Sequence, residues 1–277
     1  MQPIVRPLLL LHSSTALREA LGEVPGHMYM FTEVADWSAL RDGLSRAPLT
    51  AIAVVDPCDA EGNAAEGLRE ITEEFPFVTV LAALDVAPSD GEVLRTLLDH
   101  GVADFVVLGH EVTVPGLARR LRVVRSRAVK KLLHRALPAS IPSRTQGMLT
   151  RAAEVVAVGG GAPEFAAALR VSPRTVPRWC RRADLPPPRR LLAWLRLLMA
   201  AELLDQPWRS IASVARACGY ATEASLKHTS KVFLDASPSE LRRAGAFRTV
   251  ADAFAEELAR VREKAYAQGK SRNDWLN

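Results

Sequence analysis

The stretch from Trp208 to Arg242 carries the residues best suited to contact a nucleic acid. It predicts two short helices joined by a tight turn at Gly219, with Ser210 and Thr222 as the caps that begin them. The outward face of the second helix would be small, polar and basic, as a helix entering a major groove about 12 Å wide requires. The expected contacts on this helix are Thr222, Glu223, Lys227, His228 and Lys231, with Ala224 beside them.

Apolar side chains at helical spacing indicate how the two helices would pack. The inward face of the first helix would hold Ile211, Val214, Ala215 and Cys218. The inward face of the second would hold Leu226, Thr229 and Phe233. An ordinary helical hairpin with a solvated basic face has the same pattern, so these residues alone leave both interpretations open.

A second set of candidate contacts lies nearer the N-terminus. Ser172 suits an N-cap and Pro173 suits the first position of a helix. Pro177 lacks a backbone N–H and its ring crowds the carbonyl four residues earlier, so this helix either bends in its first turn or begins later. The expected contacts are Arg174, Thr175, Arg178, Arg181 and Arg182.

Further helices are expected to support these two units. Residues 148–158 would precede the first unit, residues 162–169 would form its first helix, and residues 246–268 would follow the second unit. Residues 189–205 would connect the units over roughly 25 Å, which can set two recognition helices about one DNA turn, near 34 Å, apart. The inward residues of 162–169 would be Phe165, Ala168 and Leu169, and those of the connecting helix Leu191, Leu195, Leu198, Met199 and Leu203.

Four ordered motifs strengthen the DNA-binding interpretation. They are SPRTVPRW at 172–179, RLLMA at 196–200, SIASVARACGY at 210–220 and SPSELR at 237–242. With them, residues 148 to about 247 resemble the DNA-binding domain of the AraC/XylS family of transcription regulators, which carries two helix-turn-helix units joined by a long helix. The chain departs from that pattern at Pro177, at Asp235 where the family usually has Gly, and at Cys180 and Ser230 where it usually has Phe.

The N-terminal half alternates apolar runs with amphipathic segments. The runs lie at residues 7–11, 28–31, 50–55, 77–84 and 103–108. Near-continuous apolar strands separated by helices are typical of a parallel sheet covered on both faces. We therefore expect a flavodoxin-like, doubly wound α/β domain followed by an all-α double helix-turn-helix domain. The first of these resembles the receiver domain of bacterial response regulators.

Phosphoryl transfer in a receiver needs an Asp after the third strand, and Asp56 occupies that place. The resemblance also implies an acidic pair that holds Mg²⁺, a Thr or Ser, and a Lys. The chain has His12 and Ser13, Ala82–Ala83, and Leu108–Gly109 at these places instead. Asp56 is therefore expected to be a vestigial phospho-acceptor that caps a local turn, in a pseudo-receiver.

The charge is distributed unevenly along the chain. Residues 1–118 contain 6 basic and 18 acidic residues, net −12, whereas the rest contains 30 basic and 13 acidic residues, net +17. An acidic half joined to a strongly basic half fits a sensor or docking domain beside a domain that binds a polyanion. RNA or an anionic lipid surface would attract the same positive charge, so the charge alone does not select DNA.

Several other functions are excluded by the same sequence. Its six histidines are isolated, the three cysteines are scattered, and Gly159–Gly161 completes no phosphate-binding motif. We therefore expect no catalytic residues, no metal and no cofactor. No apolar run approaches the roughly 20 residues of a membrane span, and no signal peptide is recognisable. The expected location is the cytoplasm, without membrane contact.

The segment between the halves is strongly basic. Residues 115–136 predict one helix, and residues 138–147 predict a linker. The helix's apolar stripe either packs on the N-terminal sheet or forms, in its second half, the seam of a homodimer. The stripe consists of Leu117, Leu121, Val124, Ala128 and Leu132.

The expected domains are residues 1–114, 115–147 and 148–277.

Together these features predict a transcription regulator that binds double-stranded DNA in the major groove. A regulatory protein or small ligand would act on its N-terminal domain. Two alternatives stay open at this point. One is a response regulator phosphorylated on Asp56. The other is a protein-interaction module that has lost specific DNA reading, which Pro177 and Ser230 would allow.

Overall fold

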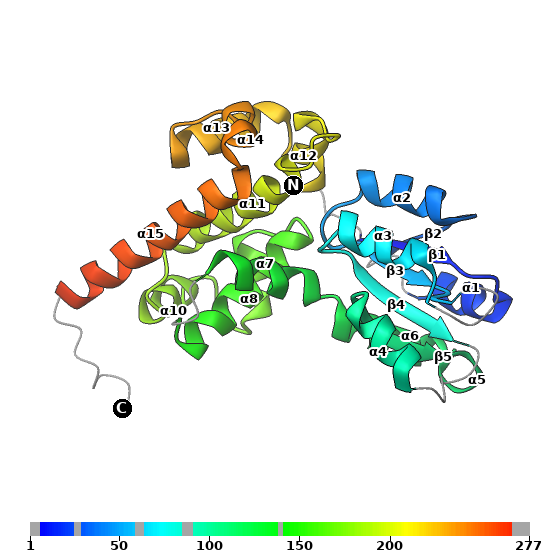
Figure 1. The fold of residues 1–277 in the computed structure, drawn as a ribbon. Helices are drawn as coiled ribbons and strands as arrows, with labels where there is room; N and C mark the ends of the chain where they lie inside the picture. Colours follow the sequence, from blue (N-terminus) through cyan, green and yellow to red (C-terminus); the bar gives the residue numbers. More distant parts are fainter. Residues whose placement is uncertain (1–5, 25–28, 59–63, 85–90, 138–140, 268–277) are drawn as a thin grey trace. The chain divides into compact units, whose positions relative to one another are not determined.

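The computed structural model describes residues 6–24, 29–58, 64–84, 91–137 and 141–267 (Figure 1). The chain divides into two compact units, and the division falls between Lys131 and Leu132. This point lies inside the segment 115–147 that we expected to join two domains. None of the helices in the described ranges is long and apolar enough to span a membrane.

A five-stranded parallel sheet forms the centre of the first unit, in the order β2-β1-β3-β4-β5. This strand order confirms the flavodoxin-like, doubly wound fold. Every residue of β3 and β4 is buried, and almost all are apolar, which suits strands covered on both faces. The strands are β1 (Arg6–Leu11), β2 (Tyr29–Glu33), β3 (Ile52–Val55), β4 (Thr79–Leu84) and β5 (Val102–Val107).

Helices cover both faces of this sheet, and each face has its own apolar core. Leu8 and Leu10 of β1 point into one core, together with residues of α1 and α6. Leu9 of β1 points into the other, together with residues of α2, α3 and α4. The helices are α1 (Thr15–Gly22), α2 (Trp37–Arg46), α3 (Glu66–Glu74), α4 (Gly91–Asp99), α5 (Leu108–Glu111) and α6 (Val114–Val124).

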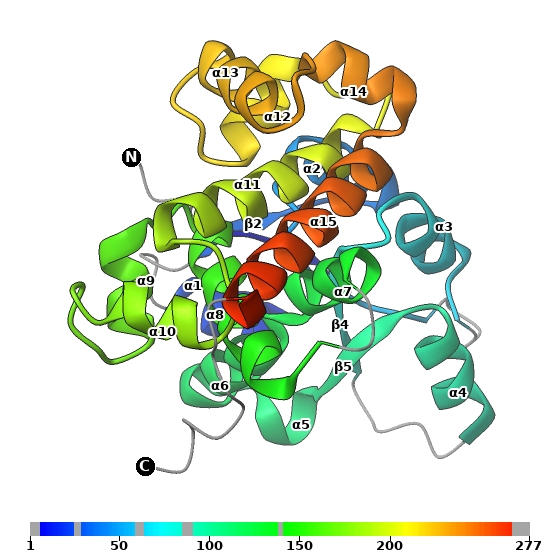
Figure 2. The same cartoon turned by 90° about the vertical axis from the view of Figure 1, so that its left-hand side faces the viewer.

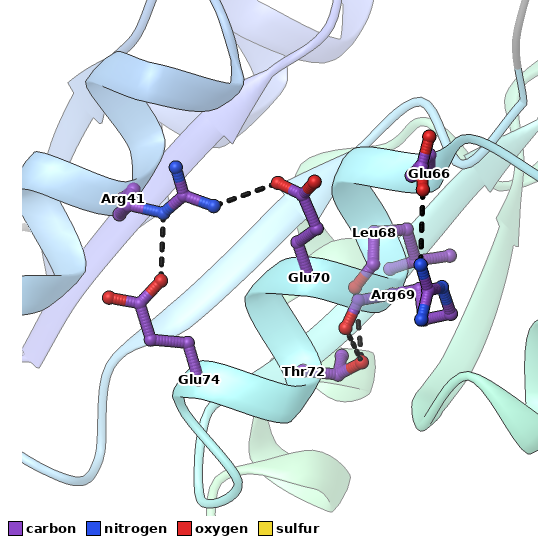
Figure 3. A network of polar contacts seen from close by, with 7 residues as sticks. All are labelled: Arg41, Glu66, Leu68, Arg69, Glu70, Thr72 and Glu74. Atoms are coloured by element: carbon purple, nitrogen blue, oxygen red, sulfur yellow. Dashed lines mark hydrogen bonds and ion pairs between the residues drawn. The ribbon is translucent and has the colours of Figure 1, made fainter.

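A network of ion pairs joins α2 to α3 at the surface (Figure 3). Arg41 of α2 contacts Glu74 through Nε at 2.7 Å and Glu70 through Nη2 at 2.8 Å. Arg69 pairs with Glu66 on the same helix at 3.0 Å. Exposed ion pairs of this kind contribute at most about 1 kcal/mol each, so the network adds little to the free energy of unfolding.

The expected single helix over 115–136 is wrong. The helix is interrupted at Arg125 and Ser126, which separate α6 from α7 (Arg127–Ala136). At the break, the Arg125 carbonyl oxygen accepts a hydrogen bond from Arg6 Nη1 at 3.3 Å. The side chain of Arg6 thus binds a backbone group at the point where the regular helix stops.

The apolar stripe of this segment is covered within the chain. Leu117 and Leu121 belong to the core on one face of the sheet, as the first of the two interpretations required. Leu132, in α7, is 1% exposed within the single chain. A dimer is therefore not needed to cover Leu132.

The second unit is entirely helical in its described part, which confirms the expected all-α architecture. Helix α8 begins at Ser143, so residues 143–147 of the expected linker are helical instead. Ala168 of α9, expected to face inward, is exposed, and Ala166 is buried in its place. The helices are α8 (Ser143–Ala157), α9 (Ala162–Ala168), α10 (Val176–Arg182), α11 (Pro188–Leu204), α12 (Ile211–Ala217), α13 (Glu223–Leu234), α14 (Pro238–Ala244) and α15 (Ala246–Ala267).

Helix α11 is the centre of this unit. It has 17 residues, about 25 Å, and its predicted inward leucines and Met199 are all buried. Helix α15 packs against it (Figures 1 and 2). Trp194 of α11 stacks on Phe254 of α15 at 5.6 Å between ring centres and meets the Phe233 ring edge-on at 4.8 Å. These aromatic contacts join α11, α13 and α15 in one core.

Candidate nucleic-acid interface

Helices α12 and α13 form the tight helical pair predicted from the sequence. Ser210 caps α12 by accepting the Ser213 amide at 3.1 Å, and Thr222 caps α13 by accepting the Ser225 amide at 3.1 Å. Gly219, between them, has φ 71°, a left-handed conformation that suits glycine. Glycine adopts this conformation without the steric cost that a side chain carries, so Gly219 suits the turn.

Cys218, just before that glycine, belongs to the core. The residue is 4% exposed, and burial raises the pKa of its thiol to about 12. A thiol with so high a pKa stays protonated and unreactive at neutral pH. Its role is packing, as the sequence pattern predicted.

The outward face of α13 holds the predicted candidate contacts. Lys227, His228 and Lys231 are exposed on this helix, and Thr222 is exposed at its start. Glu223 is half-buried, and its Oε1 lies 2.6 Å from Lys227 Nζ. The structure thus brings these five candidates onto one helix, and it joins two of them in an ion pair.

Asp235 explains one departure from the family pattern. It ends α13 in the left-handed conformation, with φ 53°, where glycine is usual and Asp is tolerated better than most residues. Its carboxylate lies 2.7 Å from Lys231 Nζ. The pair raises the pKa of Lys231 and lowers that of Asp235. The Asp therefore preserves the turn and adds a partner for Lys231.

Ser230 explains a second departure. Sequence reasoning did not place it inward, yet it is fully buried on α13. Its hydroxyl donates to the Lys227 carbonyl oxygen at 3.0 Å, which satisfies the polar group inside the core. A Ser at this place is therefore compatible with the helix-turn-helix packing.

Helix α10 begins later than the sequence pattern suggested. Its first residue is Val176, so Pro177 lies in the first turn, where a missing N–H leaves no hydrogen bond unmade. No bend is required. Thr175 is half-buried just before the helix and shares a hydrogen bond with Ser172 at 2.8 Å between hydroxyl oxygens. Arg174 lies in the same turn.

The remaining arginines of this unit lie on α10 itself. Arg178, Arg181 and Arg182 are exposed, as is Arg174 before the helix. Cys180, on the inward side, is fully buried, and burial raises the pKa of its thiol to about 11. The helix thus has one apolar side and one side rich in arginine, which is the arrangement required for contact with phosphates.

Arg190 is a supporting residue that sequence reasoning missed. It donates to both carboxylate oxygens of Glu257, through Nε at 2.5 Å and Nη2 at 3.2 Å. Its guanidinium carbon also lies 4.8 Å from the centre of the Phe233 ring on α13. The ion pair lowers the pKa of Glu257. Arg190 therefore links α13 to α11 and α15.

The carboxyl end of the sheet in the first unit holds Asp56. Leu11 of β1 pairs with Val55 of β3, so His12 and Asp56 follow neighbouring strand ends. Asp56 is exposed, and its Oδ1 accepts the Cys58 amide at 3.2 Å. It therefore caps a local turn, as predicted.

The other receiver positions at this edge are filled differently. His12 accepts the Ser14 amide through Nδ1 at 2.9 Å. Ala83 is fully buried in β4, and Leu108 begins α5 where a receiver would have its Lys. In the described part of the chain, no three His, Cys, Asp or Glu residues are grouped so that they could hold a metal ion.

Comparison with known proteins agrees with the helical unit. Residues 165–244 match the model of a helix-turn-helix domain, a range that spans α9 to α14. No curated protein matches the chain.

Three solved structures are similar to this chain at low identity. Full-length FixJ from B. japonicum is 15% identical, with a TM-score of 0.37, over 82% of this chain and 96% of that one. The RcsB response regulator of Salmonella typhimurium is 17% identical, with a TM-score of 0.34, over 69% and 98%. A pilus assembly-related protein of Burkholderia pseudomallei is 16% identical, with a TM-score of 0.35, over 45% and 91%.

Proposed function

We propose a specific mode of DNA binding for this chain, supported by residues 165–244, which match the model of a helix-turn-helix domain. The chain is a sequence-specific transcription regulator whose helices α10 and α13 enter the major groove of double-stranded DNA. The observation that carries this proposal is the pair of helix-turn-helix units on a connecting helix of 17 residues. A connection of about 25 Å suits two recognition helices on one face of the duplex, about one turn apart.

The two recognition helices supply different chemistry. Exposed arginines dominate α10, which favours contact with the DNA backbone. Helix α13 combines acidic, basic and hydroxyl groups, which favours contact with base edges. The proposed contacts are Arg174, Thr175, Arg178, Arg181, Arg182, Thr222, Glu223, Lys227, His228 and Lys231.

The receiver-like domain is proposed to act without phosphorylation. Three observations support this: His12 and Ser13 follow β1, Ala83 lies in β4, and Leu108 follows β5. A developing phosphoryl charge needs Mg²⁺ and a cation close by, and none of these side chains supplies them. Control would instead come from a regulatory protein or small ligand at this domain. We also propose that the chain forms a homodimer. Its interface would not involve Leu132, because that side chain is already buried within the single chain.

The test is selection of bound sites from random duplex DNA with the full-length protein. We expect one enriched sequence, bound at least roughly 10³-fold more tightly than random duplex. Equal affinity for selected and random DNA would contradict the proposal and favour the protein-interaction module. Acetyl phosphate added with Mg²⁺ should leave the affinity unchanged, whereas a change would favour the phosphorylated response regulator.

A further inference from the structure

The ion pair between Glu223 and Lys227 lies at the start of the second recognition helix. Glu223 is the first residue of α13, directly after the Thr222 cap, and Lys227 follows one turn later. Glu223 Oε1 lies 2.6 Å from Lys227 Nζ, and both side chains still reach solvent, at 37% and 54% exposure. The N-terminal residues of a recognition helix are those that meet base edges in the major groove.

A carboxylate at this place would normally be repelled by DNA phosphates. Two features of the structure offset that repulsion. The N-terminus of α13 carries partial positive charge, which stabilises an acidic group in the first turn. Lys227 neutralises the same carboxylate directly. The Glu223 carboxylate can therefore lie beside the duplex, where its oxygens accept hydrogen bonds.

The pair presents an acceptor and a donor side by side. In the major groove, a C·G base pair presents the matching groups: the amino group of cytosine N4 beside the O6 and N7 acceptors of guanine. An A·T pair matches less well, because the adenine amino group lies between two acceptors, N7 and thymine O4, which would repel a carboxylate. A C·G pair places only one acceptor beside the donor, and Lys227 can bind it.

We propose that Glu223 and Lys227 read a C·G base pair together. Glu223 accepts a hydrogen bond from cytosine N4, and Lys227 donates to guanine O6 or N7. This inference rests on the proposed function, and it adds the base pair and the two residues that determine that position. The other lysine pair on α13 is placed differently, since Asp235 lies beyond the last helical residue.

The experiment compares the enriched sequences of the full-length protein and two variants. The unmodified protein should enrich a C·G pair at one position. Glu223→Ala should relax that position alone, with a loss of discrimination of about 5- to 150-fold. Glu223→Gln should move the preference toward A·T, because an amide side chain matches the adenine N6 and N7 groups.

A matched control is available on another helix. Arg248 and Asp252 of α15 also form an ion pair four residues apart, at 3.9 Å, outside the matched domain. Asp252→Asn removes the same charge as Glu223→Gln and should leave the enriched sequence unchanged. Equal thermal midpoints of the variants and the unmodified protein would show that they are folded.

The outcomes separate this inference from the function on which it rests. If the unmodified protein enriches no sequence, both the proposed function and this inference are overturned. An enriched sequence that stays the same in Glu223→Ala and Glu223→Gln would overturn the inference alone. In a double-mutant cycle, Glu223→Ala and Lys227→Ala should be clearly non-additive at the C·G position. Additive effects would mean that the residues read separate base pairs, which also overturns it.

Discussion

Arg196 of α11 donates a hydrogen bond from Nη2 to the carbonyl oxygen of Gly160, at 3.1 Å. Its guanidinium carbon also lies 5.9 Å from the centre of the Tyr220 ring. Gly160 lies in the turn before α9 and Tyr220 lies in the turn before α13. One side chain of the connecting helix therefore contacts the turn that leads into the first helix-turn-helix unit and the turn inside the second.

Arg196→Ala should allow the distance between the recognition helices α10 and α13 to vary more than in the unmodified protein. Without the guanidinium, the turn at Gly160 and the Tyr220 ring lose their common contact. We expect the variant to discriminate less between the selected duplex and one with a base pair inserted between its half-sites. The loss of a hydrogen bond from a charged donor should also lower the free energy of unfolding by about 1.5–3 kcal/mol.

The control for this variant is Arg151→Ala on α8. Arg151 is exposed, and its ion pair with Glu154, at 3.2 Å, lies within a single turn of α8. Its loss should change the free energy of unfolding by no more than about 0.5 kcal/mol. The spacing hypothesis fails if Arg196→Ala and Arg151→Ala bind the duplexes of different spacing with the same relative affinities.

Gly160→Ala should destabilise the second unit. A Cβ at Gly160 would lie 2.6 Å from Val155 Cγ1 and 2.9 Å from the Val155 carbonyl oxygen, so the backbone would have to move. We expect a cost of about 1–3 kcal/mol. Urea unfolding followed by circular dichroism measures it.

Gly147→Ala is the matched substitution for that measurement. Gly147 lies within α8, and a Cβ there would meet no atom within 4 Å. Ala in place of Gly inside a helix should stabilise the protein by about 0.5–1 kcal/mol. Destabilisation by both substitutions would show that the close approach at Gly160 is not the cause.

The broad architecture was predictable because its signals are local. The apolar runs that became β1 to β5 each consist of consecutive residues, and the caps at Ser210 and Thr222 act within three residues. Helix α10 was less certain, because Pro177 allows either a bend or a later start. Only the packing of Val176 and Cys180 against the rest of the unit decides between them.

The supporting contacts could not be predicted from the sequence. Arg190 and Glu257 are 67 residues apart, and no spacing rule connects them. Arg6, which donates to the Arg125 carbonyl oxygen at the break after α6, lies 119 residues from Arg125. Ser230 is polar, so a pattern based on hydrophobicity assigns it to the surface, although its hydroxyl is satisfied within its own helix. These features depend on tertiary contacts that the chain makes only when folded.

Glu257→Gln should remove a pH-dependent part of the stability. The pair with Arg190 lowers the pKa of Glu257 in the folded protein. A lowered pKa contributes stability that is present above the unfolded pKa, about 4.3, and is lost as the pH falls through the folded value. We therefore expect the unmodified protein to be more stable than the variant near neutral pH, by about 1.5–3 kcal/mol.

Urea unfolding at several pH values tests this prediction. The difference between the two proteins should narrow as the pH falls below about 4.3. A constant difference at all pH values would mean that Glu257 contributes by packing alone. The side chain of Glu257 is 10% exposed, so both contributions have to be separated in this way.

Arg178→Ala should weaken binding to all DNA sequences alike. Arg178 is exposed on α10, the helix proposed to contact the backbone. Loss of one phosphate contact should reduce the slope of log affinity against log salt by about 0.9. Lys227→Ala should instead relax the preference at one base pair. A variant Arg178→Ala that changed the enriched sequence would show that α10 reads bases.

Asp56 should not accept a phosphoryl group from a small donor. Its Oδ1 already accepts the Cys58 amide at 3.2 Å, and His12, which follows the neighbouring strand, accepts the Ser14 amide. Neither contact brings a second carboxylate to Asp56, although two or more anionic oxygens are the usual ligands of Mg²⁺ beside a phosphate. The expected result with acetyl phosphate and Mg²⁺ is an unchanged intact mass.

Two substitutions at Asp56 separate a structural role from a phosphoryl-accepting one. Asp56→Asn keeps an oxygen that can accept the Cys58 amide, whereas Asp56→Ala removes it and should cost about 0.5–1.5 kcal/mol of stability. Both should bind the selected DNA as tightly as the unmodified protein does, since the proposed DNA contacts all belong to the helical unit. A mass gain of one phosphoryl group that both substitutions abolish would instead restore the response-regulator interpretation. In that case the Mg²⁺ ligands would have to come from residues other than His12 and Ser13, because neither side chain is a carboxylate.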